Sequence, residues 1–180
     1  MNKKLKQIKL LITDVDGVLT DGALYYDANG EALKCFNVRD GLGIRMLIEN
    51  GVQVAVLSGR DSAILRKRIA DLGITLFQLG KLEKRTACQQ LMAQAGVSAE
   101  QTAYIGDDSV DLPAFASCGL AVAVADAPDY IQDAADITLN TAGGKGAVRE
   151  LSDAILRAQG HDAIFTSAEG FLKTAKKMAQ

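Results

Sequence analysis

Residues that build zinc sites, disulfide frameworks and histidine-based catalytic triads are scarce in this sequence. It holds one histidine, His161, and three cysteines, Cys35, Cys88 and Cys118, without C-x-x-C spacing. An odd number of separated cysteines disfavours a disulfide framework and a zinc site, and it indicates a reducing compartment, the cytoplasm. The single histidine near the C-terminus and the lack of a G-x-S-x-G motif disfavour Ser-His-Asp chemistry.

Long basic runs and long apolar runs are also missing. The formal net charge is −2, and the densest basic stretch, Arg66-Lys67-Arg68, falls within a predicted amphipathic helix. No stretch approaches the ~20 apolar residues that span a membrane. The apolar run after the basic N-terminus stops at Ile12, which is too short for a signal peptide. We therefore expect neither nucleic acid nor a membrane as a partner.

The sequence does contain a regular alternation of short apolar runs and helical patterns. Apolar runs predict strands over residues 8–12, 52–57, 76–79, 102–105 and 120–124. Apolar spacing near 3.6 predicts helices over residues 42–50, 63–72, 84–95, 112–117 and 147–158. Continuous apolar strands between helices are typical of a mainly parallel sheet covered on both faces. The predicted fold class is α/β, a three-layer Rossmann-like fold.

One segment interrupts this alternation. Asn29-Gly30 between β-rich runs is a strong hairpin signal, so we predict a projecting β-hairpin over residues 23–38, just after the first strand. The length of 180 residues suits one domain. We predict a core over residues 1–160 that includes this hairpin, and a C-terminal tail over residues 161–180 that is either helical near residues 171–178 or frayed.

Residues able to perform chemistry follow the predicted strands, at the sheet edge where ligands bind in open α/β folds. Acids follow the first and fourth runs along the chain, Ser58 and Arg60 follow the second, and Lys84 opens the helix after the weak third run. Carboxylates gathered in one crevice repel one another unless a cation lies among them. Oxygen ligands without histidine or cysteine indicate Mg²⁺. The acids concerned are Asp14, Asp16, Asp107, Asp108 and Asp111.

Two acids separated by one residue after a strand suit phosphoryl transfer. An aspartate can attack phosphorus directly, and a second acid can protonate the leaving oxygen and then activate water. Asp14 and Asp16 can both face the crevice if Val15 points into the protein. Ser58 can donate a hydrogen bond to a phosphoryl oxygen, and Lys84 can supply positive charge in the transition state.

Each of these features is weak when taken alone. Asp-x-Asp-Gly occurs in ordinary turns, and a single serine or lysine is more often a helix-start or surface residue. Arg60 and Arg68 would lie about two turns apart on a helix beginning near Asp61, where they could grip an anionic substrate or simply be solvated. The segment Gly143-Gly144-Lys145-Gly146 does not fit the P-loop pattern, so we expect a loop that caps the next helix. Only the joint occurrence of these features at one edge of the sheet indicates phosphoryl-transfer chemistry.

In order and spacing, these residues resemble the four motifs of the haloacid dehalogenase superfamily. They are Asp14-Val-Asp16-Gly-Val-Leu-Thr20, Leu57-Ser58-Gly59-Arg60, Lys84, and Gly106-Asp107-Asp108-Ser-Val-Asp111. The resemblance implies Mg²⁺-dependent hydrolysis of a phosphomonoester through an aspartyl-phosphate, with Asp14 as nucleophile and Asp16 as general acid and base. It also implies that the Asp14 side chain, the Asp16 carbonyl and the Asp107 side chain hold Mg²⁺, with Asp108 and Asp111 in support.

Further segments resemble a branch of this superfamily that removes phosphate from a sugar acid used for lipopolysaccharide. They are residues 36–41, Arg45 and residues 143–150. The implied partner is a small phosphorylated sugar acid, and several arginines suit its carboxylate and phosphate. The implied substrate contacts are Asp16, Asn37, Val38, Arg39, Asp40, Gly41, Arg45, Arg60, Arg68 and Lys84.

The segments between the motifs leave no room for the large cap domain that many members of this superfamily carry. We expect a neighbouring subunit to close the crevice, and the resemblance implies a homotetramer whose hairpins pack together and whose tails reach neighbouring sites. Two alternatives stay open. One is a phosphatase or phosphotransferase, such as a mutase, that acts on another small sugar phosphate. The other is an inactive regulatory subunit, although such a relative would usually have lost Asp14, Asp16 or Lys84.

Overall fold

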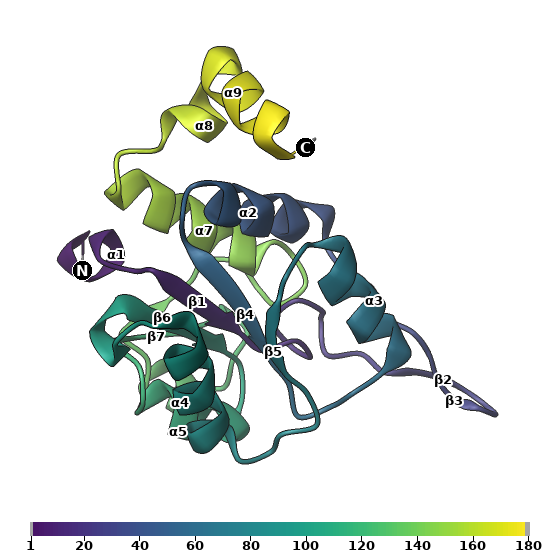
Figure 1. Cartoon of the computed structure of the whole chain (residues 1–180). Helices are drawn as coiled ribbons and strands as arrows, with labels where there is room; N and C mark the ends of the chain where they lie inside the picture. Colours follow the sequence, from purple (N-terminus) through teal and green to yellow (C-terminus); the bar gives the residue numbers. More distant parts are fainter. Residues whose placement is uncertain (1, 179–180) are drawn as a thin grey trace.

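A six-stranded parallel sheet forms the centre of the computed structural model, which describes residues 2–178 (Figure 1). Its strands are β1 (Leu10–Thr13), β4 (Gln53–Leu57), β5 (Leu76–Gln78), β6 (Thr102–Gly106), β7 (Leu120–Ala123) and β8 (Ile137–Thr138). The strand order is β5-β4-β1-β6-β7-β8, with every neighbouring pair parallel. The strands β1, β6 and β7 are buried along their whole length, because helices cover both faces.

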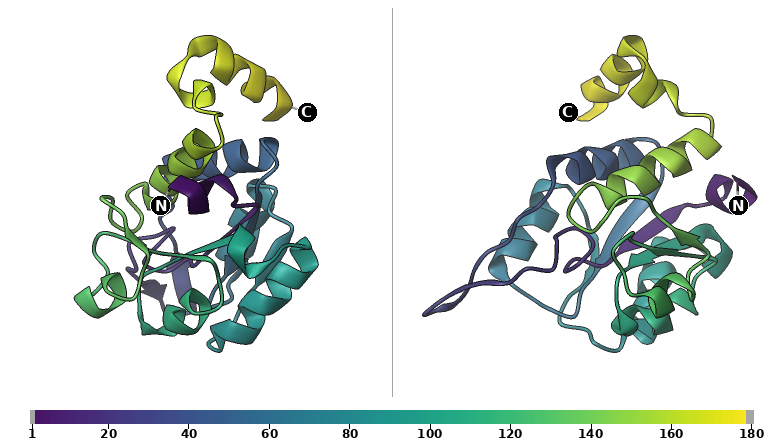
Figure 2. Two further views of the ribbon diagram at one scale, coloured as in Figure 1. Left: turned by 90° about the vertical axis from the view of Figure 1, so that its left-hand side faces the viewer. Right: turned by 180° about the vertical axis from the view of Figure 1, so that it is seen from behind.

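Helices form the two outer layers of the fold. The helices α2 (Val38–Glu49), α3 (Ala63–Asp71) and α7 (Ala147–Ala158) lie on one face, and α4 (Lys84–Ala95) and α5 (Leu112–Phe115) lie on the other (Figures 1 and 2). The remaining helices are α1 (Asn2–Lys6), α6 (Asp129–Gln132), α8 (Ala163–Thr166), α9 (Ala168–Met178), and the 3-10 turns Ala99–Gln101 and Ser109–Asp111. The predicted three-layer α/β class is confirmed. Residues 2–178 contain no cap domain, and none of their helices has the length and apolar character needed to cross a membrane.

The predicted hairpin is present and projects away from the core (Figure 1). Its strands, β2 (Tyr25–Asp27) and β3 (Gly30–Leu33), pair antiparallel. The turn is stabilised by the Asp27 carboxylate, which accepts a hydrogen bond from the Asn29 nitrogen at 2.7 Å, and Gly30 takes a φ of 121°. The pairing register shifts between Tyr25 and Tyr26, which marks an irregularity in the ladder.

Helix boundaries follow local capping chemistry. Glu83 accepts hydrogen bonds from the nitrogens of Arg85 and Thr86 at the start of α4, and Gly96 ends this helix with a φ of 68°. The bounds of α4 and α7 match the predicted ranges. Asn37 caps α2, which therefore begins four residues earlier than its apolar pattern predicts. The helix predicted over residues 63–72 is α3, which begins at Ala63 as its apolar pattern predicts, two residues after Asp61, because Ser62 caps it.

The tail after α7 folds back over α2 (Figure 2). The helix α9 includes residues 171–178, which favours the helical alternative for this segment. One guanidinium nitrogen of Arg45 on α2 donates a hydrogen bond to the carbonyl oxygen of Met178 at 3.3 Å. The division into a core over residues 1–160 and a tail over residues 161–180 stays a prediction.

The glycine-rich loop before α7 packs on the loop that follows β1. The Gly144 nitrogen donates a hydrogen bond to the Val18 carbonyl at 2.9 Å, and the Gly143 nitrogen donates to the Asp126 carboxylate at 2.9 Å. A Cβ atom on Gly144 would stand 2.5 Å from the Asp21 backbone nitrogen. The loop precedes α7 as predicted, and it also supports the first acidic motif, which the sequence pattern does not indicate.

Two glycines with the same backbone conformation allow this contact to be tested. Gly144 has a φ of 67° and lies against neighbouring backbone, whereas Gly96 has a φ of 68° and a Cβ atom there would have no described atom within 4 Å. We expect Gly96→Ala to lower the free energy of unfolding by about 1–2 kcal/mol through left-handed strain alone. Gly144→Ala should cost about 1–3 kcal/mol more, because its Cβ meets backbone that cannot easily move. Urea unfolding at one protein concentration measures the difference, and equal losses would contradict the packing argument.

Candidate active site

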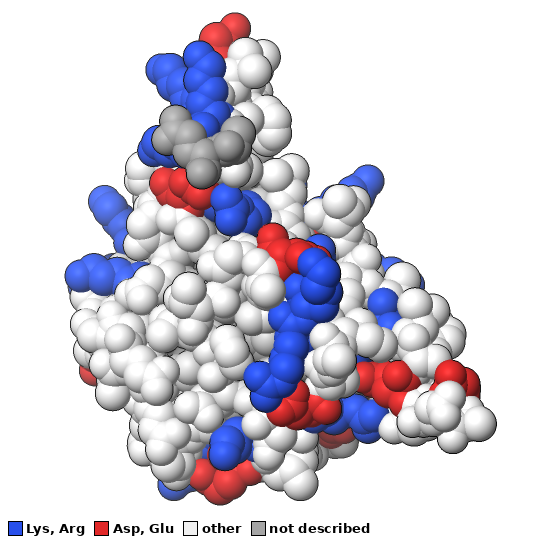
Figure 3. Space-filling model, turned by 45° about the vertical axis from the view of Figure 1, so that its right-hand side comes forward, with Lys and Arg blue, Asp and Glu red and all other residues white. Residues whose placement is uncertain are grey.

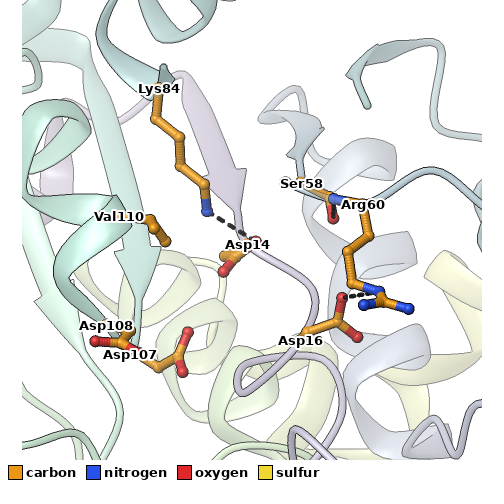
Figure 4. Close-up of a pocket in the computed structure, with 9 residues that line it drawn as sticks. Asp14, Asp16, Ser58, Arg60, Lys84, Asp107, Asp108 and Val110 are labelled. Atoms are coloured by element: carbon orange, nitrogen blue, oxygen red, sulfur yellow. Dashed lines mark hydrogen bonds and ion pairs between the residues drawn. The ribbon is translucent and has the colours of Figure 1, made fainter. Parts of the chain in front are cut away.

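The carboxyl ends of β1, β4 and β6 surround a cavity of about 170 Å³ (Figure 4). Two acids come from the loop after β1, a serine and an arginine from the loop after β4, a lysine from the first residue of α4, and two more acids from the loop after β6. The structure thus brings together side chains from all four predicted motifs. The lining residues are Asp14, Asp16, Ser58, Gly59, Arg60, Lys84, Asp107, Asp108 and Val110.

Lys84 is almost completely buried and lies between two carboxylates. Its Nζ atom is 3.0 Å from Asp14 Oδ1 and 2.7 Å from Asp111 Oδ1. Burial lowers the pKa of the Lys84 ammonium group, but Asp14 and Asp111 raise it further, so the net direction is upward and the group stays charged. Lys84 therefore supplies a fixed positive charge beside Asp14.

Asp111 acts as an internal anchor for this arrangement. Its carboxylate is fully buried and accepts hydrogen bonds from Lys84, from the Tyr104 hydroxyl at 2.7 Å, and from the backbone nitrogens of Asp107 and Asp108 at 2.9 and 3.2 Å. Both oxygens are thus occupied by donors of the protein. Any support that Asp111 gives to a metal therefore comes from holding the lysine and the loop after β6.

Asp108 has a different environment from the other predicted acids. The residue is exposed, and its carboxylate accepts a hydrogen bond from the Ser109 nitrogen at 2.6 Å. In Figure 4 the Asp108 carboxylate points away from Asp14, whereas that of Asp107 points toward the cavity. The contact with Ser109 indicates that Asp108 stabilises the turn after β6.

Burial and mutual repulsion of the cavity acids outweigh the compensating charge of Lys84. Burial, and then the neighbouring Asp111 charge, raise the pKa of Asp14 to about 7 despite the opposing effect of Lys84. Burial, and then the Asp14 charge, raise the pKa of Asp107 to about 8. One carboxylate oxygen each from Asp14, Asp107 and Asp111 lie within 4.8 Å of one another. Such an oxygen-only set fits Mg²⁺, which the side chains of Asp14 and Asp107 and the Asp16 carbonyl would hold.

Ser58 and Arg60 form the wall opposite Asp107 in Figure 4. The Ser58 hydroxyl oxygen is buried and accepts a hydrogen bond from the Arg60 nitrogen at 3.1 Å. The Arg60 guanidinium group donates to the Tyr26 hydroxyl at 2.7 Å, and its Nε atom lies 4.0 Å from Asp16 Oδ2. A cation and a hydroxyl group therefore border the side of the cavity that faces the hairpin.

Most of the other predicted substrate contacts lie outside the cavity lining. Asn37 caps α2 and donates a hydrogen bond to the Gly144 carbonyl at 3.3 Å, and Asp40 accepts one from the Arg149 nitrogen at 2.8 Å.

The predicted arginine contacts also have partners within the protein. Arg45 pairs with Glu49 at 3.2 Å, and Arg68 stacks over the Phe36 ring. Val38 is 80% exposed. Arg39 and Gly41 lie with Val38 and Asp40 in the first turn of α2. Their predicted contacts with substrate stay predictions, because the structure gives several of them structural partners.

The sequence patterns miss one cation at the site. Lys34, from the end of the hairpin, forms an ion pair with the Asp16 carboxylate and lies 2.9 Å from Glu31 Oε1. In Figure 3 the hairpin projects at the right, and acidic and basic side chains lie next to each other where it meets the core. The spacing of Glu31 and Lys34 is a weak signal, because a charged pair on a hairpin is usually solvated.

Comparisons with known proteins place these motifs in a family. Residues 79–151 match the family model for haloacid dehalogenase-like hydrolases. A curated 3-deoxy-D-manno-octulosonate 8-phosphate (KDO 8-phosphate) phosphatase from Haemophilus influenzae is 70% identical over 180 residues, which cover 100% of both chains. The chain belongs to the haloacid dehalogenase-like hydrolases.

Two solved structures share the fold of this hydrolase. The cobalt-bound phosphatase from Haemophilus influenzae has a TM-score of 0.93 and 72% identity, and the match covers 94% of this chain and 99% of that one. The KDO 8-phosphate phosphatase from Moraxella catarrhalis, solved with magnesium, phosphate and KDO, has a TM-score of 0.88 and 36% identity, with 97% of each chain covered. The predicted membership of the superfamily is confirmed.

The raised pKa values of the hydrolase's acids predict how its stability changes with pH. The pKa values of Asp14 and Asp107 lie above the usual 3.8, so the metal-free folded state binds more protons than the unfolded chain at intermediate pH. Their contribution to the free energy of unfolding is therefore lost as the pH rises from about 4 to about 8. Added Mg²⁺ competes with these protons, and below about pH 7 its apparent affinity should fall by about tenfold per pH unit for each proton that it displaces.

Thermal melts with and without Mg²⁺, at about pH 5.5 and about pH 8, measure this effect. We expect a larger Mg²⁺-induced rise in melting temperature at the higher pH. Asp107→Asn should reduce both the pH slope of the metal-free protein and the Mg²⁺ response, which separates the cavity acids from other titrating groups. An equal Mg²⁺ effect at both pH values would contradict the assignment.

Proposed function

We propose that this hydrolase converts KDO 8-phosphate and water to KDO and inorganic phosphate, a step that serves lipopolysaccharide synthesis. The observation that carries the proposal is a buried aspartate, Asp14, 3.0 Å from the ammonium group of Lys84, with Asp16 lining the same cavity. The names of the relatives support the choice of substrate, since the match to the Haemophilus influenzae phosphatase covers the whole of both chains.

Asp14 is the proposed nucleophile. One of its carboxylate oxygens attacks phosphorus, and the bond between phosphorus and the sugar oxygen breaks, which forms an aspartyl-phosphate. Asp16 gives a proton to the departing sugar oxygen and then takes one from the water that attacks the aspartyl-phosphate, which releases phosphate and restores Asp14. Lys84 and the Ser58 hydroxyl stabilise charge on the phosphoryl oxygens. When bound, Mg²⁺ neutralises further charge on the transferring group.

The hairpin supports the proposed homotetramer. It exposes apolar side chains at Leu24, Tyr25, Tyr26 and Leu33, of which Tyr26 is 60% and Leu33 53% exposed. An isolated two-stranded hairpin is only marginally stable in water, so packing against hairpins of other copies would stabilise it. The three cysteines are unpaired, which supports the predicted reducing cytoplasm.

The first test of the proposed function is phosphate release from a panel of sugar phosphates, with and without Mg²⁺. We expect the highest kcat/KM with KDO 8-phosphate and loss of turnover after chelation of the metal. Asp14→Asn should reduce turnover by at least about 10⁴-fold while the protein stays folded, because it removes the nucleophile but leaves Asp111 paired with Lys84. Retained turnover in this variant, after mass spectrometry has excluded deamidation back to aspartate, would reject the nucleophile. A transfer product instead of free phosphate would favour a phosphotransferase.

The proposed assembly predicts the effect of making the hairpin polar. The double variant Leu24→Ser/Leu33→Ser should move the sedimentation coefficient from that of a tetramer toward smaller species and lower the activity. Tyr130→Ser is a matched control, because Tyr130 is also exposed, at 58%, but belongs to α6. A wild-type protein that is a fully active monomer at assay concentration would contradict the assembly without affecting the chemistry.

A further inference from the structure

The hairpin contains a pair of buried charges on an otherwise exposed surface. The side chain of Lys34 is 1% exposed and that of Glu31 is 8% exposed, whereas every residue of β2 is exposed. Burial of a lysine ammonium group costs free energy unless opposite charge surrounds it. Acidic side chains near Lys34 must therefore offset the cost of its burial.

Four charged side chains form a closed group at the root of the hairpin. Lys34 donates a hydrogen bond to Asp16 Oδ1 and lies 2.9 Å from Glu31 Oε1. Arg60 lies 3.6 Å from the same Glu31 oxygen and 4.0 Å from Asp16 Oδ2. Two acids and two bases balance in charge. Burial raises the pKa of Glu31, but hydrogen bonds from Lys34 and Ser62 and the charges of Lys34 and Arg60 lower it further, so the net direction is downward and Glu31 lies beside Lys34 as a carboxylate.

We propose that Lys34 is a positioning residue that holds the carboxylate of Asp16 at the cavity, and that Glu31 orients this lysine. The inference rests on the proposed function, in which Asp16 is the general acid and base. Among residues 2–178, Lys34 is the one donor with a hydrogen bond to the Asp16 side chain. The distance of 4.0 Å from Arg60 exceeds hydrogen-bond length, so Arg60 alone does not fix the carboxylate.

The two oxygens of Asp16 are thereby distinguished. Oδ1 is bound by Lys34, whereas Oδ2 accepts no hydrogen bond from the described residues and stays available for the leaving oxygen and later for water. The Asp16 side chain is 21% exposed, so without Lys34 it would be free to turn into solvent. General acid catalysis requires the acid within hydrogen-bond reach of the leaving oxygen. Lys34 thus acts on the rate through the position of Asp16.

The dependence of the rate on the leaving group separates this role from a structural one. A sugar alkoxide needs a proton to depart, whereas p-nitrophenolate departs without one. We expect Lys34→Met to lower kcat/KM for an alkyl phosphate by about 30- to 100-fold, and for p-nitrophenyl phosphate by less than about threefold. Lys34→Arg should restore kcat/KM for the alkyl phosphate at least about tenfold, because it restores a donor and a charge. Glu31→Gln should give a smaller loss with the same bias.

Two further variants, a control and a comparison, are measured on the same two substrates. Lys67→Met is the matched control, because Lys67 is an exposed lysine paired with Asp71, and neither substrate should respond. Asp16→Asn should show the same bias toward the alkyl phosphate, and its absence would overturn the proposed role of Asp16 and the positioning role together. The bias in Asp16→Asn but not in Lys34→Met would overturn the positioning role alone. Equal losses on both substrates in Lys34→Met would assign Lys34 to folding, which near-ultraviolet circular dichroism would show independently.

Discussion

The ion pairs of Lys84 with Asp14 and Asp111 are the interaction on which the site depends. A lysine at 1% exposure is tolerable in this core only because two carboxylates flank it, and each comes from a different strand end. The contacts tie the loop after β1, the start of α4 and the loop after β6 into one unit. Asp107 adds a further acid beside this unit, so the acids outnumber the single buried lysine. The excess negative charge is what a divalent cation would balance.

The sheet explains why so few residues suffice to build this unit. Neighbouring parallel strands end at one edge, so β1 and β6 deliver their acids side by side without any long excursion of the chain. The loops are then held from outside. The Gly144 nitrogen donates a hydrogen bond to the carbonyl oxygen of Val18 within the first motif, and the 3-10 turn that contains Asp111 holds the fourth motif. The positions of the reactive groups therefore depend on backbone contacts as much as on the charges.

The sequence predicts the parts of this structure that have strong, long or repeated patterns. The helices α4 and α7 match their predicted ranges. The side chains that the sequence predicts to meet line one cavity, and they are Asp14, Asp16, Ser58, Lys84 and Asp107. Apolar periodicity does not indicate the strand β8 or the helices α1, α6 and α8, because elements of two to five residues are too short to show a period. The sequence does not indicate the role of Lys34 for another reason. Its burial depends on Asp16 and Glu31 in three dimensions, and a lysine in a hairpin otherwise indicates solvent exposure.

The irregular register of the hairpin has a consequence for which side chains can face the core. In a regular strand, successive side chains alternate between faces, so Glu31 and Lys34, three positions apart, would point in opposite directions. Tyr25 pairs with Leu33 and Tyr26 pairs with Glu31, which leaves Ala32 as an extra residue. Because of this extra residue, the side chains of Glu31 and Lys34 lie on the same side of the hairpin and face the core, while Leu33 stays exposed. Deletion of Ala32, whose side chain takes no part in the chemistry, would therefore exchange the inner and outer faces of the segment that follows it.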